Sequence, residues 1–237
     1  MFVKKVMILI FLCFVNVVYA CEEIEEKYQP IDSSSIILCR TEYELAYSYD
    51  KKSADWVGEH LTSAEVDANE IRINLFKPDE DIPEQYRSEL NDYANSGYDR
   101  GHLAPAGDMA TIKGMVESFY LSNMIPQDPG HNRGIWNTLE KHVRQYALDT
   151  GEVLVFTGPI YHKESLRIGR NRILVPWGLF KVVYFLKTNE SLTFIIPNAR
   201  QVSKELPKYI STLEEVKAQT GIIFLPNLNP KERRDMD

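Results

Sequence analysis

The chain has 237 residues, of which 44% are hydrophobic, 11% aromatic and 26% charged, and its formal net charge is −7. This length can bury a real hydrophobic core, and the composition excludes an intrinsically disordered protein. The acidic total argues against a protein that coats nucleic acid. It is compatible with an enzyme that acts on a polyanion, because such an enzyme needs only a locally positive groove.

The first twenty residues have the pattern of a secretory signal peptide. Lys4 and Lys5 precede an apolar run over residues 6–18, and Ala20 ends the segment. The run is short for a membrane span, although a retained anchor is the alternative. Removing residues 1–20 takes away two lysines and no acid, which changes the net charge from −7 to −9. We expect an exported protein, periplasmic or extracellular, with one domain over residues 21–237 and no membrane span after signal removal.

Two of the three cysteines, Cys21 and Cys39, follow this segment. In an exported protein such a pair predicts a disulfide, here between the new N-terminus and the first strand. The alternative is lipidation of Cys21, which stands directly after the cleavage site. Tyr19 is bulkier than a lipidation signal normally accepts, so the pattern favours the disulfide.

The first half of the domain reads as a loop, a strand pair and an irregular stretch. A loop is expected at residues 32–35. Alternation over residues 42–49 and a second apolar run over residues 55–61 predict a hairpin-like pair of strands. Residues 62–97 are polar and irregular, with one short helix expected over 83–93.

An acid, a guanidinium, a glycine and an imidazole then follow one another as Asp99-Arg100-Gly101-His102. Pro105 stops any continuing helix, and Gly101 is expected to let the backbone turn. Three side chains that handle charge and protons look like one wall of an active site. The alternative is a polar turn with a structural histidine.

Two helices are predicted next, over residues 112–119 and from about Asn132 to Leu148. The second has regular helical spacing of its apolar residues, including Trp136, and Gly151 follows its end.

The last third alternates between strands and one helix. Strands are expected at residues 153–156, 173–175, 180–186, 192–196 and 222–225. Ser211 or Thr212 begins a capping box for a helix that stops at Gly221, and the end from Lys231 is expected to fray. These elements predict one α+β domain with a central, mainly antiparallel sheet flanked by helices.

Asn132 and Glu140 are the residues on the long helix that suit a metal site. Eight helical residues rise about 12 Å and turn about 80° beyond whole turns, so the two side chains lie on neighbouring faces. Glu140 leans back toward Asn132, because helical side chains point to the N-terminus. Asn132 can then hold an ion directly, while Glu140 accepts hydrogen bonds from the waters bound to that ion. This arrangement is typical of magnesium.

Three ordered motifs resemble the DNA/RNA non-specific endonucleases, the ββα-metal group that includes endonuclease G and the Serratia-type nucleases. They are Asp99-Arg100-Gly101-His102, Tyr120-Leu121-Ser122-Asn123-x-x-Pro126-Gln127 and Asn132-x-x-x-Trp136-Asn137-x-Leu139-Glu140. The resemblance extends less sharply over most of the domain, for example to Asp55-Trp56-Val57 and Thr157-Gly158-Pro159. It implies a fold that contains a ββα-metal motif.

The resemblance also implies roles for five matching residues. His102 corresponds to the general base, for which a neutral imidazole is suited. Asn132 corresponds to the direct magnesium ligand, and Glu140 to the carboxylate that orients the ion's waters. Arg100 corresponds to a phosphate-side arginine, and Asn123 to an asparagine that supports the site.

An upstream arginine is expected to clamp the phosphate; Arg72 is the first choice and Arg87 the fallback. The implied reaction is magnesium-dependent hydrolysis of DNA and/or RNA, with manganese as a possible substitute and products with 5′-phosphate ends. An inhibitor protein is a possible partner, and the oligomeric state stays open.

Ordinary structural roles compete with several of these assignments. Asn132 can be a helix cap, and Glu140 can pair with Arg144 at i+4. The basic loop over residues 163–172 can track a phosphate backbone or be a solvated turn. Surface or structural roles are expected for the remaining histidines, His60, His131, His142 and His162.

Two other functions compete with the endonuclease hypothesis. One is a catalytically silent nucleic-acid-binding or uptake module on the same fold, although such a module need not retain His102, Asn132 and Glu140 together. The other is a different enzyme of the ββα-metal group, such as a sequence-preferring nuclease or a phosphodiesterase.

Overall fold

The computed structural model describes residues 21–32, 35–68 and 70–236. The predicted signal peptide over residues 1–20, and residues 33–34 of the predicted loop, lie outside the described residues.

A large sheet forms the centre of the molecule, with every neighbouring pair along its main path antiparallel. Its strands, in spatial order, are β1 (Ile36–Cys39), β2 (Glu44–Ser48), β3 (Ser53–Thr62), β6 (Glu152–Ile160), β9 (Gly178–Phe185), β10 (Glu190–Pro197) and β11 (Ile210–Ser211). A further strand, β12 (Lys231–Glu232), pairs in parallel with β10. The α+β prediction with a mainly antiparallel sheet is confirmed.

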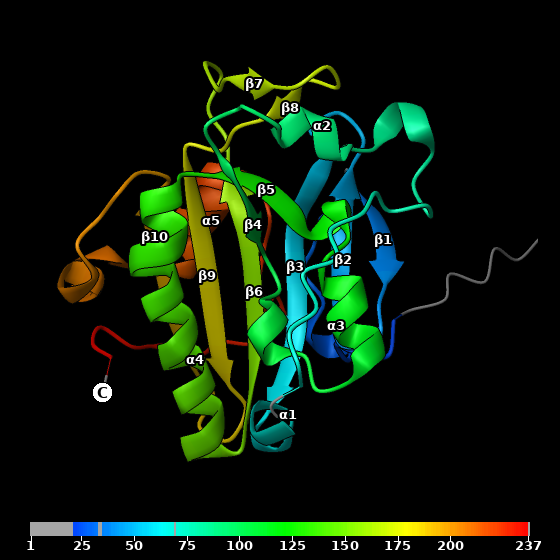
Figure 1. Ribbon diagram of the computed structural model, residues 1–237. Helices are drawn as coiled ribbons and strands as arrows, with labels where there is room; N and C mark the ends of the chain where they lie inside the picture. Colours follow the sequence, from blue (N-terminus) through cyan, green and yellow to red (C-terminus); the bar gives the residue numbers. More distant parts are fainter. Residues whose placement is uncertain (1–20, 33–34, 69, 237) are drawn as a thin grey trace, which may run out of the picture.

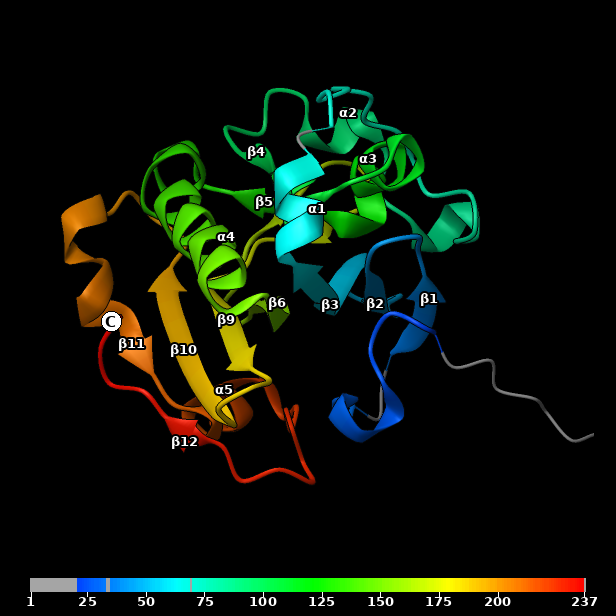
Figure 2. The same cartoon turned by 90° about the horizontal axis from the view of Figure 1, so that it is seen from below.

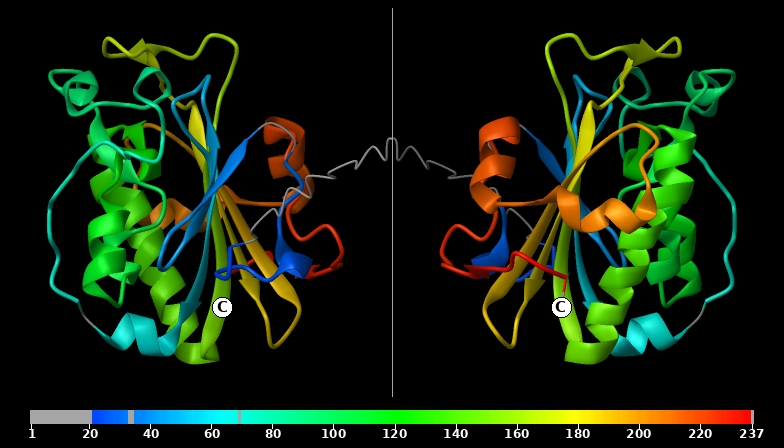
Figure 3. Two further views of the ribbon diagram at one scale, coloured as in Figure 1. Left: turned by 90° about the vertical axis from the view of Figure 1, so that its right-hand side faces the viewer. Right: turned by 90° about the vertical axis from the view of Figure 1, so that its left-hand side faces the viewer.

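Helices cover both faces of this sheet, as Figures 1 and 2 show. One face carries α1 (Ser63–Ala68), α3 (Ile112–Ser118) and α4 (Asn137–Thr150), and the opposite face carries α5 (Leu213–Thr220). In Figure 3 the green helices and the orange α5 lie on opposite sides of the strands. The smaller elements are η1 (Glu26–Tyr28), η2 (Glu84–Tyr86), α2 (Leu90–Tyr93), η3 (Ala106–Asp108), η4 (Leu121–Asn123), η6 (Ser203–Tyr209), and a ribbon of β7 (Arg167–Ile168) with β8 (Ile173–Leu174).

Alternation along the strands creates a separate core on each face. In β3, Val57 and Leu61 belong to the cluster that also contains Leu139 and Val143 of α4. Trp56, which directly precedes Val57, packs instead with Phe156 and Val216 of α5. Both faces of the sheet are therefore covered, which is why all five residues of β2 are buried, including the polar Glu44 and Ser48.

Local sequence signals predicted both ends of α5 correctly. The Thr212 side chain accepts from the Glu215 N–H (3.0 Å) at the start of α5, and Gly221 ends the helix with φ 79°. The predicted α3 and the β2–β3 hairpin are also present.

Four predictions of secondary structure are wrong. The helix expected over 83–93 is two short segments, η2 and α2, and α1 was not expected. Residues 222–225 form no regular strand, since only Ile223 makes an isolated bridge, to Ile31. The C-terminal end does not fray, because β12 joins the sheet and Arg233 forms an ion pair with Glu190 (2.8 Å). The conformation of each of these segments depends on contacts with residues distant in sequence.

The stretch expected to turn at Gly101 is a strand. β4 (Asp99–His102) pairs antiparallel with β5 (Met124–Gln127), and Gly101 faces the Gln127 side chain. A Cβ at Gly101 would stand 2.0 Å from Gln127 Oε1 and 2.6 Å from its Cβ. Gly101 is thus required for a close approach of two strands rather than for a turn.

The long predicted helix begins with a distorted turn. α4 starts at Asn137, and the preceding residues form a π-helical segment, η5 (His131–Trp136), in which Gly134 has non-helical angles of φ −105° and ψ −108°. Segments of this kind occur often at functional sites. The regular helical spacing assumed between Asn132 and Glu140 therefore does not hold.

His131 is fully buried beneath this segment. Its Nδ1 lies 2.8 Å from Gln127 Nε2, and its ring stacks on Trp136 at 5.3 Å. The contacts of Gln127 with Gly101 and His131 thus connect the β4–β5 ribbon to η5. Burial lowers the pKa of His131 to about 4, with a small opposing effect from Asp128.

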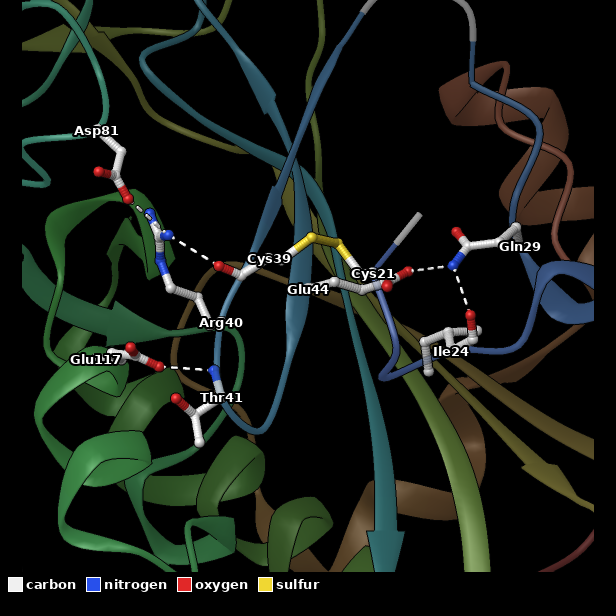
Figure 4. The surroundings of a disulfide bond; sticks show 9 residues. All are labelled: Cys21, Ile24, Gln29, Cys39, Arg40, Thr41, Glu44, Asp81 and Glu117. Atoms are coloured by element: carbon white, nitrogen blue, oxygen red, sulfur yellow. Dashed lines mark hydrogen bonds and ion pairs between the residues drawn. A yellow bond between two sulfur atoms is a disulfide. The ribbon is translucent and has the colours of Figure 1, made fainter. Parts of the chain in front are cut away.

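The predicted disulfide joins Cys21 to Cys39, as Figure 4 shows. It attaches the start of the described chain to the end of β1 and leaves no thiol on Cys21 for lipidation. Next to it, Gln29 Nε2 donates to the carboxylate of Glu44 (2.6 Å).

No helix within the described ranges has the length and apolar character that a membrane crossing requires.

The buried imidazole of His131 makes stability depend on pH. Because its folded pKa lies below the unfolded value of about 6.5, the unfolded state binds the proton first, and stability falls as the pH drops from about 6.5 toward 4. Between pH 7 and pH 5, His131→Gln should lose about 2 kcal/mol less unfolding free energy than the wild type. Urea unfolding at both pH values measures this. The exposed His142→Gln is the matched control, and equal losses in all three proteins would contradict the prediction.

Candidate active site

A cleft of about 500 Å³ opens between α4, β4 and the extended segment before α2. Its walls are formed by Arg72, Asn74, Phe76, Asp99, Arg100, His102, Pro105, Ala106, Gly107, Asn132, Arg133, Asn137, Glu140 and Arg144. It brings together five of the six predicted site residues. The sixth, Asn123, is buried nearby.

His102 ends β4 and is held between aromatic rings. Its imidazole contacts Phe119 edge-on at 4.9 Å and Phe76 at 5.7 Å. Burial, with a smaller contribution from the charge of Arg72, lowers the pKa of His102 to about 3. The ring is therefore neutral at physiological pH. Its Nε2 is enclosed without a hydrogen-bond partner in the described part of the chain.

Asn132 of η5 is oriented by Asp99, the first residue of β4, which is the strand that His102 ends. Asn132 Nδ2 donates to Asp99 Oδ2 (2.9 Å). Because an ionised carboxylate only accepts, the amide nitrogen must face Asp99, and Asn132 Oδ1 is directed away from it. Asn132 is therefore not acting as a helix cap, since η5 has no side-chain cap.

Arg133 holds the same carboxylate from the other side. Its Nε and Nη2 donate to Asp99 at 2.8 and 2.6 Å, while the guanidinium side chain stays 72% exposed. Partial burial tends to raise the pKa of Asp99, but the hydrogen bonds from Arg133 and Asn132 outweigh it and lower that pKa. Asp99 thus stays ionised.

Glu140 projects from the first turn of α4 and makes no hydrogen bond or ion pair within the described residues. The i+4 pair with Arg144 is not formed, because Arg144 Nη1 instead donates to Asp108 (2.6 Å). Burial raises the pKa of Glu140 to about 7, partly opposed by Lys181, Arg144 and Arg72. A half-buried carboxylate without a partner among the described residues can accept a cation or its waters.

A lysine lies beneath Glu140 in the core of the sheet. Lys181 on β9 is 1% exposed; its Nζ donates to Thr157 (2.5 Å) and lies 5.2 Å from the centre of the Trp136 ring. Its positive charge acts on Glu140 and on the buried Glu59 and Asp108. Glu140 therefore interacts with a cluster of buried opposite charges that does not itself line the cleft.

The predicted arginines are placed as follows. Arg72 lies 5.0 Å above Phe119, and Arg100 lies 4.3 Å above Phe76, so both guanidinium groups line the cleft next to His102. Arg72 Nε donates to Asn74 (2.9 Å), which holds it in the extended segment. Arg87, the fallback, does not line the cleft and pairs with Glu89 (2.8 Å).

Asn123 lies behind the cleft and is fully buried. Its Oδ1 accepts from the Ala104 N–H, and its Nδ2 donates to the carbonyls of Ala104 and Ser118, all at 2.9 Å. These bonds fix the loop that follows His102.

Sequence reasoning proposed no site role for seven residues of the cleft: Asn74, Phe76, Ala106, Gly107, Arg133, Asn137 and Arg144. Arg133 and Asn137 lie within or beside the recognised motifs, so position along the chain was a usable signal for them. Arg144 was considered only as a partner of Glu140. Asn74 and Phe76 belong to an irregular segment whose fold depends on distant contacts.

The oxygen donors of the cleft fit a hard divalent cation. Asn132 Oδ1 and the carboxylate of Glu140 are the donors that magnesium prefers. Among the described residues, no three His, Cys, Asp or Glu side chains gather into a metal-binding group. An amide oxygen and one carboxylate suit an ion that keeps most of its waters.

Comparison with known proteins identifies the family. Residues 22–231 match the DNA/RNA non-specific endonuclease family, whose members are metal-dependent nucleases. The Xenopus laevis protein "Nuclease EXOG, mitochondrial" is 32% identical over 228 residues, which cover 86% of this chain and 64% of that protein. "Endonuclease G, mitochondrial" of Caenorhabditis elegans is 36% identical over 209 residues, with 80% and 68% covered.

A solved structure has the same fold. EndoG in the crystal structure of the EndoG/EndoGI complex is 34% identical, with a TM-score of 0.79 over 84% of this chain and 89% of that one. The chain spans 64% and 62% of the length of the EXOG nucleases from Xenopus laevis and Danio rerio.

These relatives correct the predicted location. The EXOG and endonuclease G relatives are named as mitochondrial nucleases, which points to mitochondria rather than to export. The prediction of a periplasmic or extracellular protein is therefore wrong. It depended on residues 1–20 alone, whose lysines and apolar run do not identify the membrane that a targeting segment addresses.

The family match covers nearly all of the described residues, and both relatives and the solved structure exceed 30% identity. The chain belongs to the DNA/RNA non-specific endonuclease family.

Proposed function

We propose that residues 21–237 form a magnesium-dependent endonuclease that hydrolyses phosphodiester bonds of DNA and RNA without sequence preference. One observation carries this proposal: His102 on β4 and Asn132 on η5 line the same cleft, and both segments meet at Asp99. Manganese, a similar hard ion, is the expected substitute for magnesium.

In this proposal Asn132 holds the ion directly through Oδ1, and Glu140 accepts from its waters. The support is that Asp99 occupies Asn132 Nδ2 and that Glu140 has no protein partner within the described residues. When bound, the ion supplies positive charge next to the leaving 3′ oxygen and acidifies a water that protonates it. Cleavage at this bond leaves 5′-phosphate ends.

His102 is proposed as the general base that takes a proton from the attacking water. An imidazole must be neutral to accept a proton. Because the pKa of His102 is lowered, its ring stays neutral at pH 7 and also at pH values well below 7. Because Nε2 is enclosed, Nδ1 is the nitrogen that can reach a water in the cleft. Asn123 supports this placement through the backbone of Ala104.

The arginines of the cleft are proposed to bind the phosphate groups. Arg72 and Arg100 flank His102, and a guanidinium pairs with phosphate through two parallel hydrogen bonds. The solved relative EndoG is in complex with EndoGI, in work on EndoG inhibition. We therefore also propose an inhibitor protein as a partner of this chain.

His102→Ala should lower kcat/KM on a fluorescent duplex oligonucleotide with magnesium by about 10²- to 10⁴-fold, the usual contribution of a general base. The thermal melting temperature serves as the control for folding. Cleavage at the wild-type rate by a folded His102→Ala preparation would remove His102 from this role.

Asn132→Ala should greatly raise the magnesium concentration needed for half-maximal cleavage, because the proposed ligand atom is lost. Melting should change little, since Asn132 caps no helix. Asn137→Ala is the matched control: it removes the same amide from the same cleft. An unchanged magnesium requirement in Asn132→Ala, or equal shifts in both variants, would contradict the assignment.

A further inference from the structure

Trp177 is a large aromatic side chain that the structure leaves at the surface. It is 42% exposed, whereas Trp56 and Trp136, the other tryptophans of the chain, are buried at 1% and 0%. Its ring stacks on the ring of His162, with centroids 4.7 Å apart and planes at 19°. His162 is exposed as well. Neither ring lines the catalytic cleft.

The backbone that carries this pair is firmly held. The Trp177 N–H donates to the Ile160 carbonyl (2.8 Å), and the Trp177 carbonyl accepts from the Asn198 N–H (2.8 Å). Asn198 Nδ2 also donates to the carbonyl of Pro176 (3.1 Å). The ring therefore projects from a hydrogen-bonded backbone segment directly before β9.

The same asparagine connects the pair to the turn that bears Asn132. Asn198 Oδ1 accepts from the Asp128 N–H (2.8 Å), and its Nδ2 donates to the Pro126 carbonyl (3.0 Å). The Asp128 carbonyl in turn accepts from the Asn132 N–H (2.8 Å). The aromatic pair and the proposed metal ligand are thus parts of one hydrogen-bonded unit.

Two cations lie next to members of this unit. Lys163 follows His162 directly, and Arg200 lies against Gly130, where a Cβ would come within 2.8 Å of the arginine stem. Both cations are exposed, and neither is part of an ion pair between described residues. Glu164, also exposed, is an acidic neighbour. Asp128, a member of the hydrogen-bonded unit itself, is a second acidic neighbour. Lys163 and Arg200 can contact the phosphates of a strand that binds at Trp177.

We propose that Trp177 and His162 form a stacking platform for an unpaired base of the substrate strand whose scissile phosphate lies in the cleft. The inference rests on the proposed nuclease function and adds a binding subsite to it. Bases stack on aromatic rings without sequence preference, which suits a non-specific enzyme. His162 covers one face of the indole and fixes its plane. A paired base has no free face to offer, so the platform favours single-stranded or frayed substrate.

Fluorescence tests this directly, because Trp177 is the exposed tryptophan among the three in the chain. An oligothymidylate of about 12 nucleotides is titrated into the full-length protein in chelator, which prevents cleavage. We expect quenching of Trp177 emission. Trp177→Ala should bind this strand about 5- to 150-fold more weakly, the equivalent of about 1–3 kcal/mol for one stacked base, and Trp177→Phe should largely retain binding.

A second exposed aromatic pair provides the matched control. Tyr86 is 40% exposed and stacks on Tyr49 at 4.5 Å and 17°, but neither ring lines the cleft. Tyr86→Ala should leave strand binding unchanged, and a strand of the same length with abasic sites should bind wild type as weakly as oligothymidylate binds Trp177→Ala.

Several outcomes would overturn the proposal. These are binding by anisotropy without quenching, equal losses in Trp177→Ala and Tyr86→Ala, or equal affinity for the abasic strand. Self-association that Trp177→Ala abolishes while strand binding is unchanged would assign this face to a second copy of the chain instead. Quenching without any magnesium-dependent cleavage would support the platform and contradict the nuclease proposal. Cleavage without quenching would support the nuclease proposal and contradict the platform.

Discussion

The carboxylate of Asp99 joins the two segments from which the cleft is built. It stands at the start of β4, three residues before His102, and it accepts hydrogen bonds from Asn132 and Arg133 of η5. This group therefore helps to set the spacing of the proposed base and the proposed metal ligand. An asparagine at position 99 could offer either its amide oxygen or its amide nitrogen to Asn132. The carboxylate of Asp99 can only accept, so it permits a single orientation of the Asn132 amide.

A second constraint holds the same two segments from below. Gly101 lets Gln127 approach β4 closely, and Gln127 in turn contacts the buried His131. This close contact leaves no space for a side chain at position 101. The π-helical turn of η5 is thus fixed on both sides, which places Asn132 on the wall of the cleft rather than on a regular helix.

The charges show how an acidic chain can present a positive cleft. Four arginines, Arg72, Arg100, Arg133 and Arg144, line it, although the chain as a whole has a net charge of −7. Two acidic side chains in this region form ion pairs within the protein, Asp108 with Arg144 and Asp99 with Arg133. Net charge alone therefore says little about the ligand of one cleft.

Sequence reasoning predicted the parts of the structure that depend on local patterns. The β2–β3 hairpin, α3, α5 with its Thr212 cap, and the residues of the cleft drawn from the three motifs were all accessible in this way. It failed where contacts distant in sequence decide. β12 exists because β10 offers a free edge, and β4 is a strand because β5 pairs with it. The role of Asp99 was equally hidden, since its partner lies 33 residues away.

The central claim is that one cleft, with one divalent ion, cuts both DNA and RNA. The most direct measurement is digestion of supercoiled plasmid and of single-stranded RNA by the wild-type protein, with magnesium, with chelator, and with magnesium restored after chelation. The account predicts that both substrates are cut with magnesium, that the chelator stops both reactions, and that restored magnesium revives both to the same extent. Cutting of either substrate in chelator, or failure to cut both with magnesium, would contradict it.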